Sequence, residues 1–130
     1  MKKHTTRQTG NRGEDYAVAY LKQKQYKILE RNYYKRSGEI DIIAEKQGLL
    51  VFVEVKTRHT TTLTQPFEAV DRRKQEKIIQ TAIIYLYEKK LDRDCRFDVC
   101  EVFVNQDTLR LHTIHYIENA FMMEDSHGYY

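Results

Sequence analysis

The chain has 130 residues, of which 41% are hydrophobic and 32% are charged, a composition typical of one globular domain with a full core. No apolar run approaches the roughly 18 residues of a membrane span, and no apolar stretch follows the basic N-terminus to make a secretory signal. We therefore expect a cytoplasmic protein with no membrane partner. The net charge of +3 is compatible with a polyanionic partner, but it is too small to carry weight alone.

Hydrophobic periodicity predicts helices and strands along the whole chain. The first helix is expected over Gly13–Lys24, where Ala17, Val18 and Leu21 recur at helical spacing. Alternating and β-branched segments then predict three strands, a long helix and two further strands. These elements are expected at Tyr26–Tyr34, Glu39–Glu45, Leu49–Lys56, Phe67–Lys90, Arg96–Val104 and Leu109–Tyr116. The polar segment Thr57–Gln65 predicts a loop, and Pro66 suits a first helical position.

The order α-β-β-β-α-β-β predicts an α/β fold with one mixed sheet and helices packed on it. The connection through the long helix is long enough to cross over between parallel strands. We assign residues 1–121 to a single domain and residues 122–130 to a flexible polar tail.

The most informative segment is the hairpin closed by Gln47-Gly48, because a two-residue loop fixes the pairing of its strands. The residue numbers of each opposed pair then add up to 95, so that Asp41 faces Glu54 and Glu39 faces Lys56. These four polar residues share one face of the hairpin, since side chains alternate along a strand. The other face is wholly apolar and predicts core positions at Ile40, Ile42, Ala44, Val51, Val53 and Val55.

Two carboxylates opposite each other repel unless a positive charge lies between them. Lys56 could supply that charge, and so could a divalent cation with oxygen ligands. Mg²⁺ binds one or two carboxylates and keeps several waters, which leaves room for a phosphate. The pattern therefore predicts a phosphodiester hydrolase that uses Mg²⁺ or Mn²⁺, with Asp41 and Glu54 as ligands and Lys56 acting on the water. The alternative is a cluster of surface salt bridges at a sheet edge.

Two further residues lie on the apolar face of their predicted helices, which places them near Asp41 and Glu54. Glu14 lies one turn before Ala17 and Val18, so it points inward, either toward the metal or to stabilise the first helix through its dipole. Lys74 lies four residues after Val70 in the second helix, which predicts either a phosphate contact beside Gln75 or a snorkelling lysine.

Basic residues follow the predicted site in sequence. A rim that neutralises backbone phosphates is one interpretation, and a solvated, charged helix face is the other. The residues concerned are Arg58, Arg72, Arg73 and Lys77.

Several separated strings resemble the YraN-like family, and the resemblance runs from about Asn11 to Phe121. The strings are Gly13-Glu14, Arg31-Asn32, Gly38–Ala44, Val51–Arg58, Glu68–Val70, Lys74-Gln75 and Arg96–Asp98. That family is similar to archaeal Holliday-junction resolvases and is placed in the restriction-endonuclease-like fold. The resemblance therefore implies a central mixed sheet flanked by helices, and it implies a homodimer.

The resemblance also implies roles for particular residues. Asp41, Glu54 and the backbone carbonyl of Val55 would hold the metal, and Lys56 would be the catalytic lysine. Glu14 matches the acid that the resolvase-type branch carries on its first helix, and Lys74-Gln75 match residues on the helix after the core.

Two features depart from the family's pattern. Ile40 precedes Asp41 where the wider superfamily has a proline, which supplies no ligand. The loop Thr60–Gln65 is rich in threonine and has no glycine before Pro66.

The leading hypothesis is thus an endonuclease acting on DNA rather than RNA, including branched or structured DNA. Its main alternative is a nucleic-acid-binding module of the same fold that does not cleave. A third, weaker reading is a protein-interaction scaffold.

Overall fold

The computed structural model of the chain describes residues 4–62 and 69–123. Within these ranges the order of helices and strands is α-β-β-β-α-β-β, as predicted. The elements are α1 (Thr6–Gln23), β1 (Lys27–Lys35), β2 (Gly38–Lys46), β3 (Leu49–His59), the short 3₁₀ helix η1 (Thr60–Thr62), α2 (Arg72–Lys89), β4 (Cys95–Val104) and β5 (Leu111–Phe121). No helix in the described ranges is long and apolar enough to cross a membrane.

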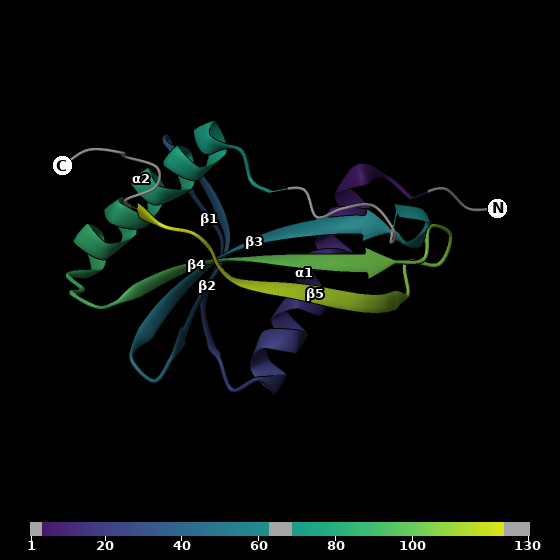
Figure 1. Cartoon of the computed structure of the whole chain (residues 1–130), viewed down its shortest axis with the longest axis horizontal. Helices are drawn as coiled ribbons and strands as arrows, with labels where there is room; N and C mark the ends of the chain where they lie inside the picture. The colour runs from purple at the N-terminus through teal and green to yellow at the C-terminus, as the bar shows by residue number, and fades with distance from the viewer. Residues whose placement is uncertain (1–3, 63–68, 124–130) are drawn as a thin grey trace.

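The five strands form one sheet in the order β1-β2-β3-β4-β5. The pair β3 and β4 is parallel and every other neighbouring pair is antiparallel, which confirms the predicted mixed sheet. The chain passes through α2 between the two parallel strands, and Figure 1 shows α2 well separated from α1.

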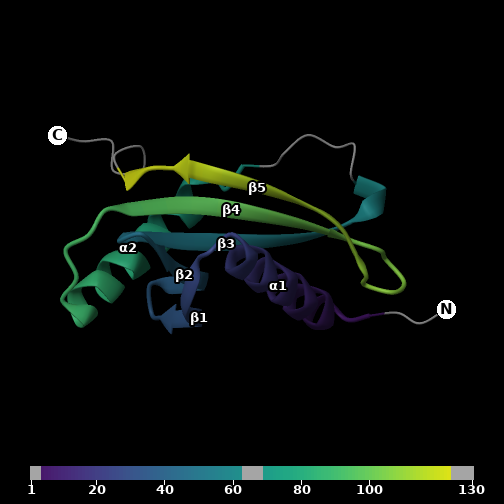
Figure 2. The ribbon, with the colours of Figure 1, turned by 90° about the horizontal axis from the view of Figure 1, so that it is seen from below.

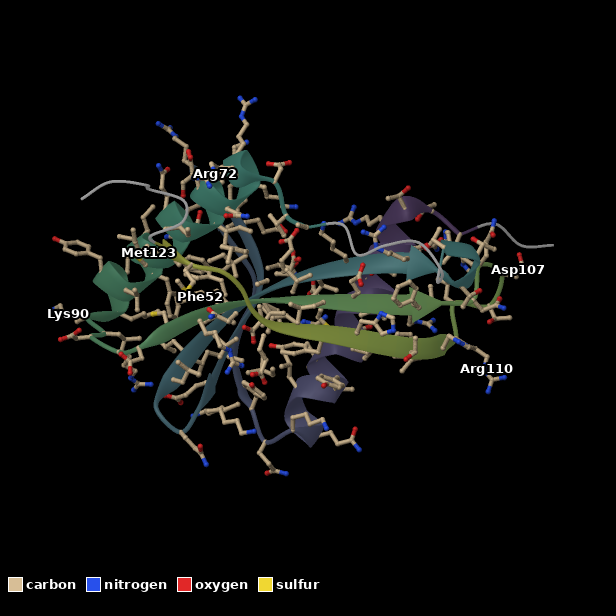
Figure 3. The ribbon with its side chains drawn as sticks, in the orientation of Figure 1. Phe52, Arg72, Lys90, Asp107, Arg110 and Met123 are labelled. Atoms are coloured by element: carbon tan, nitrogen blue, oxygen red, sulfur yellow. The ribbon has the colours of Figure 1, made fainter. Side chains whose placement is uncertain are left out.

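Each helix covers a different set of side chains on the sheet. Ala17, Val18 and Leu21 of α1 join one core cluster with Val51 and Val53 of β3. Residues of α2 join a second cluster with Leu50 and Phe52, which alternate with those valines along β3. Figure 2 shows α1 running beside β3, and Figure 3 shows Phe52 in the interior near α2. Both faces of the central hairpin are therefore buried.

The predicted hairpin register is confirmed from Lys46 opposite Leu49 to Ile42 opposite Val53. The ladder between β2 and β3 then ends, one pair short of Asp41 and Glu54. Ile40 was predicted to share the core face of Ile42, but it packs in the α2 cluster instead. That prediction is wrong because β2 leaves β3 at Asp41, where simple alternation across the hairpin no longer applies.

The boundaries of both helices differ from the prediction. The first helix begins earlier, at Thr6, because Thr5 and Gln8 form a capping box ahead of the apolar periodicity. The second begins at Arg72, where the Asp71 side chain accepts a hydrogen bond from the Lys74 amide. Residues 69–71 are therefore not helical, contrary to the prediction, and Pro66 and Phe67 lie outside the described residues.

The strands beside the site also differ from the prediction. Residues 57–59 extend β3 where a loop was expected, because they continue the parallel pairing with β4. The last strand begins at Leu111 rather than Leu109 and extends to Phe121, beyond the predicted Tyr116. Residues 63–65 of the predicted loop and residues 124–130 of the predicted tail lie outside the described residues.

Candidate active site

Asp41 lies at the point where β2 separates from β3. Its Oδ2 accepts a hydrogen bond from the backbone N–H of Val55 at 2.8 Å. A side chain thus replaces the backbone partner that a continued ladder would have supplied. The carboxylate is held at the end of the hairpin, directly beside the residues that follow Val53 on β3.

The surroundings of Asp41 are strongly negative. Burial, followed by the neighbouring carboxylates of Glu54, Glu14 and Glu39, raises the pKa of Asp41 to about 7, although the hydrogen bond from the Val55 N–H opposes the shift. The sequence predicted the proximity of Asp41 and Glu54. The structure adds Glu14 and Glu39 to the same electrostatic neighbourhood.

Glu54 is the more deeply buried member of the pair, with 7% of its side chain exposed. Its Oε2 lies 2.5 Å from Nζ of Lys74, whose side chain is 53% exposed. Burial alone would lower the pKa of Lys74, but the hydrogen bond and charge of Glu54 outweigh it and the pKa is raised. Lys74 therefore partly neutralises the charge of Glu54. The sequence had predicted either a snorkelling lysine or a phosphate contact, and neither prediction included this ion pair.

Glu14 points inward from α1, as its phase predicted, and only 8% of the residue is exposed. A close approach of α1 to β3 places it there. A Cβ built on Gly13 would lie 1.8 Å from Oγ1 of Thr57, so only glycine permits this contact. The residue after that glycine is thereby fixed against the sheet.

Two residues of β1 bind Glu14. The Oε1 atom accepts a hydrogen bond from Nδ2 of Asn32 at 2.9 Å and pairs with Nη2 of Arg31 at 3.1 Å. Asn32 has a φ of 53°, in the left-handed region that asparagine tolerates better than most residues. Reasoning from periodicity missed both residues. Their only signal was the Arg31-Asn32 string in the family resemblance.

Two cavities meet at Asp41 and Glu39, which line both. The first, here called the α1 cavity, has a volume of about 460 Å³ and lies between the first half of α1 and the ends of β1, β2 and β3. The second, the α2 cavity, has a volume of about 400 Å³ and is lined by Glu54 and by Arg73, Lys74 and Lys77 of α2. Asp41 is therefore accessible from both cavities, and Glu54 from the α2 cavity.

The remaining predicted residues are less closely assembled. Lys56 lies two residues beyond Glu54 on β3, half-buried, and is absent from the lining of both cavities. Nε of Arg58 donates a hydrogen bond to Glu101 at 2.8 Å, and Nε2 of Gln75 donates one to the Val70 carbonyl at 2.8 Å. Arg72 lies at the exposed first turn of α2 (Figure 3).

The donor atoms suit a hard cation, although the side chains do not form a complete cage. Over residues 4–62 and 69–123, no three His, Cys, Asp or Glu side chains are grouped as a ready metal site. Mg²⁺ is commonly held by only one or two carboxylates and retains several waters. Asp41 and Glu54 supply such a pair, and their surplus of negative charge favours a cation.

Fold and site together define an α/β protein with a mixed sheet and two neighbouring carboxylates, one half-buried and one buried, at the end of its central hairpin. Residues 13–102 match the uncharacterised protein family UPF0102, which confirms the resemblance to the YraN-like family. The chain belongs to this family.

Three relatives cover between 72% and 93% of the chain. A UPF0102 protein of Caldanaerobacter subterraneus subsp. tengcongensis is 43% identical over 122 residues, which span 93% of this chain and 100% of the relative. One from Chlorobium phaeobacteroides is 42% identical over 88% of this chain and 94% of its own length. One from Fusobacterium nucleatum is 51% identical over 72% of this chain and 79% of its own length.

Proposed function

We propose that the chain is a metal-dependent endonuclease that hydrolyses phosphodiester bonds in DNA, branched or structured DNA included. One observation carries the proposal. The carboxylates of the half-buried Asp41 and the buried Glu54 lie at the end of the β2–β3 ladder, where Asp41 lines two cavities and Glu54 lines one of them. Core packing does not account for two acids there, because both faces of the paired segments Ile42–Ala44 and Leu50–Val53 are apolar.

Asp41 and Glu54 would hold the cation, together with the backbone carbonyl of Val55. Mg²⁺ or Mn²⁺, when bound, would polarise a phosphoryl oxygen and lower the pKa of a coordinated water. Asp41 is fixed for this task by the Val55 N–H, and Glu14 adds negative charge from α1. Glu14 is itself oriented by Arg31 and Asn32, so we assign it a supporting role.

Cationic side chains lie on the α2 side of the acids. Arg73, Lys74 and Lys77 line the α2 cavity and would contact phosphates of the nucleic acid. Lys56 shares the face of Glu54 on β3 by strand alternation, and we propose that it stabilises the charge that develops on the attacked phosphate. Arg58, Arg72 and Gln75 are more distant contributors to the same surface.

The test combines Mn²⁺ titration by calorimetry with a cleavage panel of duplex, branched and single-stranded DNA. We expect Asp41→Asn to lower Mn²⁺ affinity at least tenfold and to abolish cleavage. Lys56→Ala should keep Mn²⁺ binding and lose cleavage. Asp92→Asn, at an exposed position far from the acids in sequence, is the matched control and should change neither.

Failure of the wild type to bind Mg²⁺ or Mn²⁺ at millimolar concentration would refute the proposal. So would Mn²⁺ binding that Asp41→Asn leaves intact.

The ion pair between Lys74 and Glu54 favours a second candidate, a nucleic-acid-binding module that does not cleave. In that case Lys74 would neutralise Glu54 permanently and no cation would be needed. This function predicts DNA affinity that falls steeply with salt and is the same with EDTA, with Mn²⁺ and in Asp41→Asn.

A further inference from the structure

We propose that the α1 cavity binds one unpaired nucleotide of a DNA strand, next to the bond that Asp41 and Glu54 would cleave. The inference rests on the proposed function and narrows its substrate to strands with an unpaired nucleotide beside the cut. A nucleotide enters a cavity between a helix and a sheet only when its base has left the stack.

The size and chemistry of the cavity define the kind of ligand. Its volume of about 460 Å³ falls within the roughly 300–1,000 Å³ of small-molecule sites. Such sites are usually apolar, but here Val55 is the one apolar residue in the described lining. Hydroxyl and amide groups of Thr9, Asn11, Asn32 and Thr57 line the walls. A sugar phosphate with a polar base edge suits these walls better than an apolar ligand.

Charge is arranged along the cavity in an order that fits a nucleotide. Three carboxylates line the cavity, those of Glu14, Glu39 and Asp41, and Arg7 contributes a guanidinium from the start of α1. Arg7 and Glu14 are seven residues apart, which is about 10 Å along a helix at 1.5 Å per residue. A phosphate would therefore bind near Arg7, away from the acids that would hold the cation.

His59 provides an unpaired polar atom at the cavity wall. Its Nδ1 is buried and has no hydrogen-bond partner among the residues that the structure describes. Buried polar atoms rarely lack a partner, and a rotation of the imidazole ring toward the cavity would bring Nδ1 to a ligand hydroxyl or amino group.

Gly10 is the most informative residue of the lining. It lies in the interior of α1, where glycine is a poor helix former, and a Cβ built on it would meet nothing within 4 Å. Packing therefore explains Gly13 but not Gly10. A ligand that approaches the helix backbone would explain it.

The experiment measures binding without cleavage, by fluorescence anisotropy in EDTA at low salt. The probes are a labelled single-stranded hexanucleotide and a labelled blunt duplex. Gly10→Gln fills the cavity from an exposed helix position, and Ala19→Gln, also exposed on α1, is the matched control. We expect Gly10→Gln to weaken hexanucleotide binding at least fivefold and duplex binding less than twofold, with Ala19→Gln changing neither.

A competition arm separates a nucleotide within a strand from a free one. Unlabelled dTMP at millimolar concentration should displace the hexanucleotide from the wild type less effectively than an unlabelled hexanucleotide does. Equal displacement by dTMP overturns the assignment to a strand.

Equal losses for both probes in Gly10→Gln, or no loss for either, overturn the inference. Circular dichroism melting curves of the variants serve as the control for a retained fold. The proposed function fails separately. If no DNA is cleaved while the selective loss in Gly10→Gln persists, only the endonuclease is refuted, and if DNA is cleaved while the loss is absent, only this inference is refuted.

Discussion

Asp98 and Asp41 are aspartates of the same sheet with very different surroundings. Asp98 is 0% exposed, and its oxygens accept hydrogen bonds from Arg96, from the Tyr116 hydroxyl at 2.6 Å and from the Asn119 amide at 2.8 Å. Asp41 accepts a hydrogen bond from the Val55 N–H, and its charged neighbours include three other acids. One aspartate is fully compensated, and the other carries surplus negative charge.

The two environments also differ in what they do to their neighbours. Hydrogen bonding to Asp98 raises the pKa of the Arg96 guanidinium, and burial together with Asp98 raises the pKa of Tyr116. The Asp98 cluster is therefore satisfied within the protein itself. A buried acid with surplus charge is the arrangement that more often marks a functional site. The comparison suggests that Asp98 stabilises the fold and that Asp41 serves a ligand.

The largest expected effect is that of Asp98→Asn. The change removes the buried carboxylate that pairs with Arg96 and leaves this guanidinium only the exposed Glu118 at 3.7 Å, so we expect the free energy of unfolding to fall by about 3–5 kcal/mol. Urea denaturation followed by circular dichroism measures it, with Asp92→Asn as the exposed control. A loss below about 1 kcal/mol would mean that Asp98 does not stabilise the fold as argued.

In EDTA, Asp41→Asn should instead increase the free energy of unfolding. Folding raises the pKa of Asp41 from 3.8 to about 7, so the folded chain binds this proton more tightly than the unfolded chain. The stability that the proton provides is fully present below about pH 4 and is lost as the pH rises through about 7. Since asparagine cannot ionise, the variant should be more stable than the wild type by about 1–3 kcal/mol at pH 8.

Urea titrations at pH 4, 6 and 8 measure this difference. It should be near zero at pH 4 and should increase with pH. A variant that is less stable than the wild type at pH 8 would show that Asp41, like Asp98, is compensated within the fold.

The smallest effect is expected for Lys74→Met. Removing a half-exposed partner from Glu54 should cost about 1 kcal/mol, because solvent already screens much of the pair. The variant also takes away a positive charge near Asp41, so Asp41→Asn should stabilise the Lys74→Met protein more than it stabilises the wild type. A double-mutant cycle at pH 8 measures this coupling, with the exposed Lys22→Met as the control. Strictly additive effects of the two substitutions on the free energy of unfolding would contradict this coupling.

The fold was largely predictable because its signals are local. The Gln47-Gly48 turn determined the register of β2 and β3, and periodicity identified both helices, since each buries one apolar stripe. Errors arose where a capping side chain or a non-local partner decides the structure. Thr5 begins α1 before its apolar stripe, and β4 pairs with residues 57–59 of β3, which by composition resemble a loop.

The candidate site was predictable only in part. The hairpin register predicted that Asp41 and Glu54 are neighbours, which they are although the ladder ends one pair before them, and helical phase predicted that Glu14 points inward. No periodicity indicates that Lys74 pairs with Glu54, that Asn32 takes a left-handed conformation, or that Gly10 faces a cavity. These features depend on how α1 and α2 are placed on the sheet, which is tertiary information.

The contact between Gly13 and Thr57 divides α1 into two parts with different freedom to evolve. From Gly13 onward, adding one residue would turn every later side chain by about 100° around the helix axis and carry Glu14 away from the sheet. Before Gly13, insertions and substitutions would reshape the α1 cavity while the acids stay in place. One glycine thus separates a segment whose length is constrained from one in which new ligand preferences could arise.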